Sequence, residues 1–415
     1  MTTSTTTLTP PLALPSGAPA AARAVFKLLR RLRHGTLQVQ WPDGTHTQFG
    51  EPAAAGQVPR ALLRLHNWQP CAATLRSGDI GFAETYIAGD WDTPDLPALL
   101  KLLLVNREQI ESVVYGRWWG ALAYRLKHLL NRNSRSGSRR NIHAHYDLGN
   151  PFYREWLDET MNYSSAWFEG DTQRPLADAQ RAKVRRAIRE CGLQPGQRLL
   201  EIGCGWGAVA ESAAVEFGAH VTGVTLSTEQ LAHAQARMAR AGAADRCDLR
   251  LQDYRDIDDG PYDAVVSIEM FEAVGREYWP TFFQTLRRQL KTGGKACIQS
   301  ITIREDLFER YVKGTDFIQQ YVFPGGLLPS PSRFREQAEA AGLRVVQELD
   351  FGPDYAETLA RWRTAFMSRE GPIRQLGYDA PFIRLWTFYL AYCEAAFATG
   401  NTSVMQFTLE KTGSA

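Results

Sequence analysis

The chain has 415 residues, too many for one ordinary domain, so two or more domains are expected. Hydrophobic residues make up 44% of it, enough for a proper core, but no uninterrupted apolar run approaches the ~18 residues of a transmembrane helix. The formal net charge of +2 excludes a general polycation, and the six scattered cysteines, which lack metal-ligand spacing, are typical of reduced cytosolic thiols.

The N-terminus begins with a polar tail and a basic segment. Residues 1–20 are rich in Thr, Pro and Ala without a charged start or long apolar core, which predicts a disordered tail and not a signal peptide. Residues 21–33 predict an amphipathic helix without acids, either lying on anionic lipid or packed on its own domain. Its basic residues are Arg23, Lys27, Arg30, Arg31 and Arg33.

A compact module is predicted over residues 21–106. Apolar and polar residues alternate from Thr36 to Trp41, and Pro42-Asp43-Gly44 follows as a turn, which is typical of a hairpin. The leucine-rich run 99–104 indicates packing, and no set of residues here has catalytic spacing.

Residues 107–142 form a predicted basic linker. They hold eight Arg and Lys residues against Glu108 and Glu111, with Trp118 and Trp119 among them. Basic residues with tryptophan suit the boundary of a bilayer. Nucleic acid is the other usual partner of such a run, but the chain has no recognisable nucleic-acid module. We therefore expect a cytoplasmic protein, peripheral at the inner face of the membrane, that binds no nucleic acid.

Strands and helices alternate over residues 143–415, which predicts an α/β domain with a parallel sheet covered on both faces. Strands are expected at residues 198–202, 220–224, 247–251, 263–267, 295–301, 344–350 and 404–410. Ligands of such sheets bind beyond the carboxyl ends of the strands.

The strongest motif follows the first of these strands. The stretch Arg198-Leu-Leu-Glu-Ile-Gly-Cys-Gly-Trp-Gly207 places three glycines at alternate positions before a helix, where the backbone can approach a ligand. Its spacing is G-x-G-x-G, not the G-x-G-x-x-G of dinucleotide-binding folds, and Glu201 ends the strand. It resembles the first motif of S-adenosylmethionine (SAM) methyltransferases. An ordinary tight turn is the alternative.

Polar residues also follow the next strands. Thr225 ends the second strand, and Ser227 and Gln230 open the following helix as cap and donor. Gln252 and Asp253 follow the third strand, where they could meet adenine.

Two acids, Glu269 and Glu272, follow the fourth strand. A spacing of three predicts that they share one side of a helix. Surface pairing explains many such acids, but their place behind a buried strand end favours a function.

Motifs in order along residues 20–411 resemble the cyclopropane-fatty-acyl-phospholipid synthase family. They are His145-Tyr-Asp-Leu-Gly-Asn150, Met161-Asn-Tyr-Ser-Ser-Ala166, the glycine-rich turn, Val224-Thr-Leu-Ser227 with Glu229-Gln230, Met270-Phe-Glu272 with Val274-Gly275, Tyr321-Val-Phe-Pro-Gly-Gly326 and Asp350-Phe-Gly-Pro-Asp-Tyr355, with an N-terminal match from Gly81 to Trp91.

The resemblance implies a Rossmann-like class I SAM methyltransferase domain with a seven-stranded sheet, preceded by a smaller α+β domain. It implies an enzyme that adds a methylene group from SAM across a cis double bond of a phospholipid acyl chain, and, by analogy, a homodimer. The implied cofactor-binding residues are Tyr163, Ser164, Glu201, Gly203, Gly205, Thr225, Leu226, Ser227, Gln230, Gln252, Asp253, Tyr254 and Ser267.

The resemblance also implies a bound bicarbonate ion as the base that removes a proton from the new methyl group. Glu272 and Tyr355 match the family's Glu and Tyr, and the backbone amides would come from Ser165 and Ile301. Ser165 replaces the family's usual Cys, and Gln299 replaces its His, so this position cannot carry charge. A His that often follows the Glu is replaced by Ala273.

These departures leave several products open. Cyclopropane formation comes first, and a methyl- or methylene-branched chain is the alternative. A methyltransferase of small molecules and a non-catalytic lipid-binding protein are the rival classes.

The reaction needs a dry site, because water would trap the carbocation, and aromatic faces could stabilise that cation. Aromatic side chains near the motifs are available, though such residues are also ordinary core: Tyr146, Tyr163, Trp167, Phe168, Phe271 and Tyr321. Residues 303–331 predict a lid or a helix packed on the sheet, and a last amphipathic helix is expected near Trp386 and Tyr389. No metal site is predicted, since His143 and His145 stand without further ligands.

Overall fold

The computed structural model describes residues 14–50, 60–114 and 148–413. The chain divides into two compact units, Met1–Gly120 and Ala121–Ala415. No helix within the described ranges has the length and apolar character needed to cross a membrane. The predicted tail up to residue 13 and most of the predicted basic linker, including both tryptophans, lie outside these ranges.

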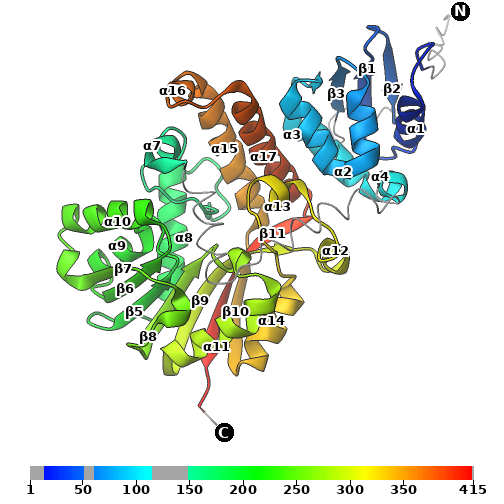
Figure 1. The fold of residues 1–415 in the computed structure, drawn as a ribbon. Coiled ribbons are helices and arrows are strands. Elements are labelled where there is room, and N and C mark those ends of the chain that lie inside the picture. The colour runs from blue at the N-terminus through cyan, green and yellow to red at the C-terminus, as the bar shows by residue number, and fades with distance from the viewer. Residues whose placement is uncertain (1–13, 51–59, 115–147, 414–415) are drawn as a thin grey trace, which may run out of the picture. The chain divides into compact units, whose positions relative to one another are not determined.

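The N-terminal unit contains a four-stranded sheet with the order β2-β1-β3-β4 (Figure 1). The predicted hairpin is confirmed, because β1 and β2 pair antiparallel on either side of Gly44. The strands are β1 (Thr36–Gln40), β2 (His46–Phe49), β3 (Arg60–Leu65) and β4 (Trp91–Asp92), and the helices are α1 (Ala20–Leu29), α2 (Gln69–Ala88), α3 (Leu96–Val105) and α4 (Arg107–Val114).

Helix α1 is the predicted basic helix, and its apolar side packs on its own domain. Phe26 lies against Phe49 with ring centroids 5.2 Å apart, and Leu28 and Leu29 are buried. The helix ends at Leu29 and not at the predicted residue 33, so Arg30, Arg31 and Arg33 follow it, and all five predicted basic side chains are exposed. The core of the unit therefore already covers the apolar face, and only the basic face remains for other contacts.

Asn106 ties α4 to the same unit. Its side chain is fully buried, accepts hydrogen bonds from the backbone N–H groups of Arg33 and His34, and donates to the carbonyls of His34 and Leu102. Helix α4 also contacts α1, α2 and α3. Residues 107–114, the first part of the segment predicted as a basic linker or helix, thus form a helix that packs with the N-terminal unit.

The second unit contains a seven-stranded sheet with the order β10-β11-β9-β8-β5-β6-β7. All seven predicted strands are present: β5 (Arg198–Ile202), β6 (His220–Thr225), β7 (Cys247–Leu251), β8 (Tyr262–Ile268), β9 (Leu290–Ile303), β10 (Leu343–Asp350) and β11 (Thr402–Lys411). The prediction of a parallel sheet was wrong for β11, which pairs antiparallel with both β9 and β10.

Helices cover both faces of this sheet (Figure 1). Alternate residues of β5 point to opposite sides, so Leu199 packs under one layer of helices and Leu200 under the other. The first layer comprises α8 (Leu176–Glu190), α9 (Ala208–Val215) and α10 (Thr228–Arg240), and the second comprises α11 (Trp279–Gln289) and α14 (Pro331–Ala340).

The remaining helices pack through aromatic side chains. Trp156, which follows α7 (Gly149–Arg154), meets Trp362 of α15 (Gly352–Ser368) and Trp386 of α17 (Ala380–Ala398). The predicted last helix is therefore confirmed as α17, with α16 (Glu370–Gln375) before it. Short 3₁₀ helices occupy Ala244–Arg246, Tyr254–Asp256, Phe271–Ala273 and Arg276–Tyr278.

The predicted lid segment forms two short helices, α12 (Glu305–Tyr311) and α13 (Phe317–Tyr321). Phe317 is fully buried and meets Phe388 of α17 in an edge contact with centroids 4.9 Å apart. Asp316 caps α13 in a reciprocal capping box with Gln319. This segment is therefore packed against α17 in the structure.

Candidate active site

A pocket lies at the carboxyl ends of β5, β6, β7 and β8, where an α/β sheet is expected to bind its ligand. The turn from β5 into α9 forms one wall. Gly203 has a φ of 86°, and a Cβ there would lie 2.9 Å from Cγ of Met270. Glycine is therefore required for the backbone to form this wall.

Most of the predicted cofactor-binding residues line the pocket: Tyr163, Ser164, Glu201, Gly203, Gly205, Thr225, Leu226, Gln230, Gln252, Asp253 and Tyr254. Ser227 and Ser267 do not line it. The Ser227 hydroxyl accepts a hydrogen bond from the backbone N–H of Gln230 and caps α10. The Ser267 hydroxyl donates to the carbonyl of Ile202 and joins two strands.

Other lining residues are absent from the predicted cofactor set, among them Asn162, Trp206, Arg255 and Met270. Glu269 also lines the pocket; the sequence indicated a function for this acid but assigned it to neither the cofactor nor the anion. Each of the five lies within two residues of a predicted site residue. Proximity to the motifs was the available signal, but side-chain direction at a turn does not follow from sequence spacing.

Glu201 gives the pocket an acceptor for a cation. Its side chain is 3% exposed, and its Oε2 atom has no hydrogen-bond partner among the described residues. Burial raises the pKa of Glu201 well above its usual value. A buried carboxyl with one oxygen left unpartnered suits a ligand that brings positive charge, and SAM carries such charge at its sulfonium and amino groups. The residues present therefore fit SAM.

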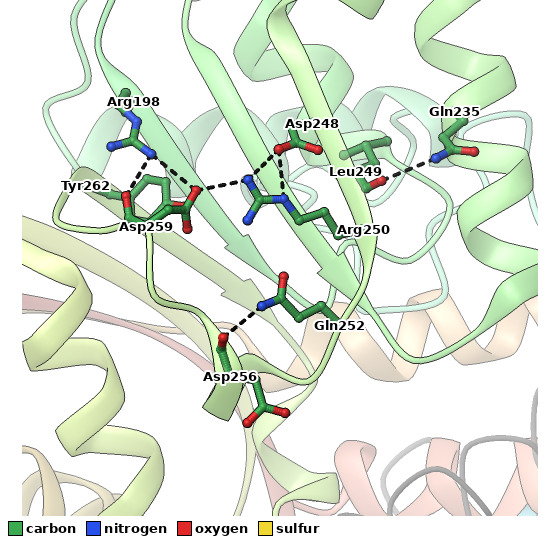
Figure 2. A network of polar contacts seen from close by, with 9 residues as sticks. All are labelled: Arg198, Gln235, Asp248, Leu249, Arg250, Gln252, Asp256, Asp259 and Tyr262. Carbon is green, nitrogen blue, oxygen red and sulfur yellow. Dashed lines mark hydrogen bonds and ion pairs between the residues drawn. The ribbon is translucent and has the colours of Figure 1, made fainter.

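The loop after β7 is held by a polar network (Figure 2). Arg250 binds the carboxylate of Asp259 at 2.9 Å, and the Tyr262 hydroxyl donates to the same carboxylate at 2.7 Å. The Gln252 amide donates to the carbonyl of Asp256 at 2.9 Å. This network fixes the loop between β7 and β8, which supplies four of the lining residues, Gln252 to Arg255.

Three of the residues predicted to hold an anion converge on a single carboxylate, that of Glu269. Its Oε1 accepts hydrogen bonds from the backbone N–H of Ser165 at 2.8 Å and from Nε2 of Gln299 at 2.7 Å. Its Oε2 accepts from the Tyr355 hydroxyl at 2.7 Å. The Ser165 hydroxyl turns away and donates to the carbonyl of Ala166, so only the backbone of Ser165 serves the site.

Glu272 lies apart from these donors. Its Oε1 accepts from the Ser300 hydroxyl at 3.0 Å and from the backbone N–H of Ile301. The prediction that both acids share one side of a helix was wrong, because Glu269 precedes the short 3₁₀ helix Phe271–Ala273 and is not helical. Ile301 therefore serves Glu272, whereas Ser165, Gln299 and Tyr355 serve Glu269.

A buried relay sets the direction of the Gln299 amide. Arg186 donates to Oε1 of Gln406 at 2.6 Å, and Nε2 of Gln406 donates to Oε1 of Gln299 at 3.0 Å. Because a guanidinium group only donates, each amide in turn must present its oxygen toward Arg186. The Gln299 NH₂ group is thereby directed at Glu269.

Lys183 supplies buried positive charge to the site. The side chain is fully buried, and its Nζ donates to the Ser164 hydroxyl at 2.5 Å. Burial lowers the pKa of Lys183 to about 8, and the charges of Glu269 and Asp158 oppose that shift. Burial likewise raises the pKa of Glu269, opposed first by Lys183 and then by its hydrogen-bond donors.

The pKa of Glu272 is raised to about 8, mainly by burial and further by the charge of Glu269. Its usual value is 4.5, so between about pH 4.5 and pH 8 the folded state holds a proton that the unfolded state has lost. The stability contributed by Glu272 therefore falls as the pH rises through this window.

We expect the Glu272→Gln variant to gain thermal stability relative to the natural protein as the pH rises from about 5 to about 8, since Gln has no proton to retain. Each kcal/mol gained in the free energy of unfolding should raise the melting temperature by roughly 2–4 °C. Calorimetry across this range measures the difference, with Glu309→Gln, an exposed acid, as the control. Parallel pH profiles of the Glu272→Gln variant and the natural protein would contradict the expectation.

The predicted aromatic residues divide between pocket and core. Tyr163 lines the pocket, and its hydroxyl lies 2.7 Å from that of Tyr389. Phe168 and Phe271 are fully buried as core, while Tyr146 lies outside the described residues. Within the described ranges no three His, Cys, Asp or Glu side chains gather as metal ligands. His143 and His145 lie outside those ranges.

The chain is similar in sequence to known methyltransferases and cyclopropane synthases. The model of the mycolic acid cyclopropane synthetase family matches residues 133–407. The tuberculostearic acid methyltransferase UfaA1 of Mycobacterium tuberculosis is 40% identical, over 96% of this chain and 94% of that protein. The cyclopropane-fatty-acyl-phospholipid synthase of Escherichia coli K12 is 32% identical, over 86% of this chain and 90% of that protein.

Among solved structures, the mycolic acid cyclopropane synthase CmaA1 complexed with SAH and CTAB has a TM-score of 0.62 and 35% identity, over 66% of this chain and 98% of that one. The neighbour contains SAH, in agreement with the SAM pocket described above. The chain belongs to the cyclopropane synthase family and is a SAM-dependent methyltransferase.

Proposed function

We propose that the protein transfers a one-carbon unit from SAM to the cis double bond of an unsaturated fatty acyl chain in a membrane phospholipid, and that a cyclopropane ring is the product. The observation that carries this proposal is a SAM pocket whose wall contains a buried carboxylate, Glu269, held by three donors. Methyl transfer to a nitrogen or oxygen needs no such base once the leaving proton can reach water, whereas ring closure requires a proton to leave carbon.

SAM supplies an electrophilic methyl group: its S–C bond breaks toward sulfur, while the π pair of the alkene forms the new C–C bond and leaves a carbocation. The residues of the protein position the reactants and protect the carbocation from water. The glycine-rich turn and Glu201 hold the cofactor, and a buried site excludes water that would trap the cation. Tyr163, on the pocket wall, offers an aromatic face near the reacting centre.

A methyl- or methylene-branched chain is the second candidate product. The relative that is 40% identical over both units is named as a methyltransferase of a fatty acid and not as a cyclopropane synthase. Gln299 and Ala273 also depart from the residues of ring-forming relatives noted above. A hydride shift before the loss of the proton would convert the same cation into a methylene branch.

The experiment is mass spectrometry of lipids from a host that lacks its own synthase and expresses this chain. We expect unsaturated acyl chains to gain 14 mass units, the mass of one CH₂ group. Fragmentation or NMR then separates a ring from a branch. Unchanged lipids, with the protein folded and binding SAM, would overturn the proposal.

The exposed basic face of α1 supports the proposed action at an anionic membrane surface. Charge reversal at Lys27 and Arg30, both exposed, should weaken binding to anionic vesicles by at least about 10-fold, because each basic residue near such a surface contributes ~1 kcal/mol. Vesicle co-sedimentation at low salt measures this, with neutral vesicles as the control. Equal binding by the variant and the natural protein would remove α1 from the interaction.

A further inference from the structure

Glu269 occupies a backbone position that glycine would adopt freely. It follows β8 with a φ of 47°, in the left-handed region, where a residue with a Cβ atom is strained. Such positions persist only where the surroundings hold them, and they cluster at active sites. Three hydrogen bonds to the side chain hold this one. The carboxylate therefore accounts for the unusual backbone.

A separate bicarbonate ion does not fit this arrangement. Four donors were expected to hold it. Three of them, the backbone N–H of Ser165, the amide of Gln299 and the hydroxyl of Tyr355, already donate to Glu269. The fourth, the backbone N–H of Ile301, donates to Glu272. A second anion here would also place like charges together in a buried site, without a histidine to compensate. The chain itself supplies the carboxylate that the family resemblance assigned to a bound ion.

The surrounding charges favour the ionised form of Glu269 more than they favour the ionised form of Glu272. Lys183 is a buried cation whose charge interacts with those of both Glu269 and Asp158. Glu272 lacks such a partner, and its Oε2 atom has no donor within the described residues. Burial raises the pKa of both carboxyl groups, but Lys183 and three donors oppose that shift at Glu269. Two neighbouring carboxyl groups whose surroundings favour the ionised form of one more than that of the other are typical of a site that moves protons.

We propose that Glu269 is the catalytic base that removes the proton from the transferred methyl group, in place of an external bicarbonate ion; this inference rests on the proposed function. Glu269 lines the SAM pocket, and in the described residues its Oε2 accepts one hydrogen bond, from Tyr355, which leaves a lone pair for a proton.

The step balances without an oxidant or reductant. Oε2 takes a proton from the new methyl group, and the electron pair of that C–H bond forms the third C–C bond of the ring and cancels the positive charge. Neutral Glu269 returns the proton to solvent after the product leaves. Overall, the alkene and cationic SAM give the cyclopropane, S-adenosylhomocysteine and one proton.

The test compares the full-length protein with two variants, using SAM and vesicles of an unsaturated phospholipid in buffer freed of carbon dioxide. We expect the natural protein to work without bicarbonate and to change by less than about 2-fold when millimolar bicarbonate is added. Glu269→Gly and Glu269→Gln should each lose about 10²–10⁴-fold in kcat, the range for a general base, with little change in SAM affinity.

The two variants differ in what they leave behind. Glu269→Gly frees the three donors and suits the local backbone, so added bicarbonate or formate should bind there and restore part of the rate. Glu269→Gln fills the same space with a neutral amide and should not respond to either ion. Carbon-13 NMR of labelled bicarbonate gives a readout independent of turnover, with saturable binding expected for the Gly variant alone.

Bicarbonate dependence of the natural protein, or an active Glu269→Gln variant, would overturn the inference while leaving the proposed function intact. A Gly variant that binds bicarbonate and still stays inactive would also overturn it. Failure of the natural protein to alter any lipid, with SAM bound normally, would instead overturn the proposed function and this inference with it. Melting temperatures and SAM titrations establish that each variant is folded.

Discussion

Replacing Tyr355 by phenylalanine is expected to lower kcat by about 10–100-fold, because the hydroxyl donates to the Oε2 atom of Glu269 at 2.7 Å and a hydrogen bond to a charged group contributes ~1.5–3 kcal/mol. Tyr355 is 6% exposed, so water cannot readily replace the lost donor. SAM affinity should stay within about 2-fold, since Tyr355 does not line the cofactor pocket.

The pH dependence gives this prediction a second readout. A donor to the ionised carboxylate favours that form, so its loss raises the pKa of Glu269 further. The acid limb of the kcat/KM profile should therefore move to higher pH in the Tyr355→Phe variant. An unmoved limb would mean that Glu269 is not the group that titrates in the profile.

Tyr262→Phe is the matched control. Tyr262 is also buried and donates to a carboxylate, that of Asp259 at 2.7 Å (Figure 2). It lies at the beginning of β8, whereas Glu269 follows the end of that strand. It should lose stability in the same way while keeping its pH profile. Equal kinetic losses in both variants would point to a general loss of packing.

The second large effect concerns cofactor binding. Glu201→Gln should weaken SAM binding by about 10–100-fold, because the variant loses a charge-assisted contact in a buried site. Titration calorimetry with SAM measures the loss. Glu216→Gln, an acid on the same side of the sheet that does not line the pocket, is the control and should bind SAM normally.

Proton release supplies a further check on Glu201. Burial raises the pKa of this carboxyl in the ligand-free protein, and a bound cation would lower it again. SAM binding should thus release protons, and SAM affinity should rise with pH across the range in which Glu201 titrates. Calorimetry in buffers of different ionisation enthalpy detects this release, which the Gln variant should lack. Proton release that persists in that variant would assign the titration to another group.

Periodicity and composition were enough to predict all seven strands of the second unit and the pocket at their carboxyl ends. Local patterns determine strands such as β5 and β8, because each is a short buried run between polar turns. Residues that end neighbouring parallel strands must meet at one edge, which is why Glu201, Thr225 and Gln252 were correctly placed in one pocket.

The sequence alone could not assign the direction of β11 or the apolar side of α1. Strand β11 joins the sheet between β9 and β10 and runs antiparallel to both, although three helices, α15, α16 and α17, separate it from β10 along the chain. Helix α1 has the same amphipathic pattern whether it meets lipid or protein, and only the presence of Phe49 opposite Phe26 decides between them.

The sequence was enough to predict SAM binding and a pair of acids at a strand end, because both follow from local motifs. Which of the two acids accepts the hydrogen bonds became clear only from the folded chain. Ser165, Gln299 and Tyr355 come from segments that are distant in sequence, and Glu269 reaches them from a turn in which its own backbone is left-handed. Spacing along the chain carries no record of such a turn, because it depends on donors that only the folded chain brings together.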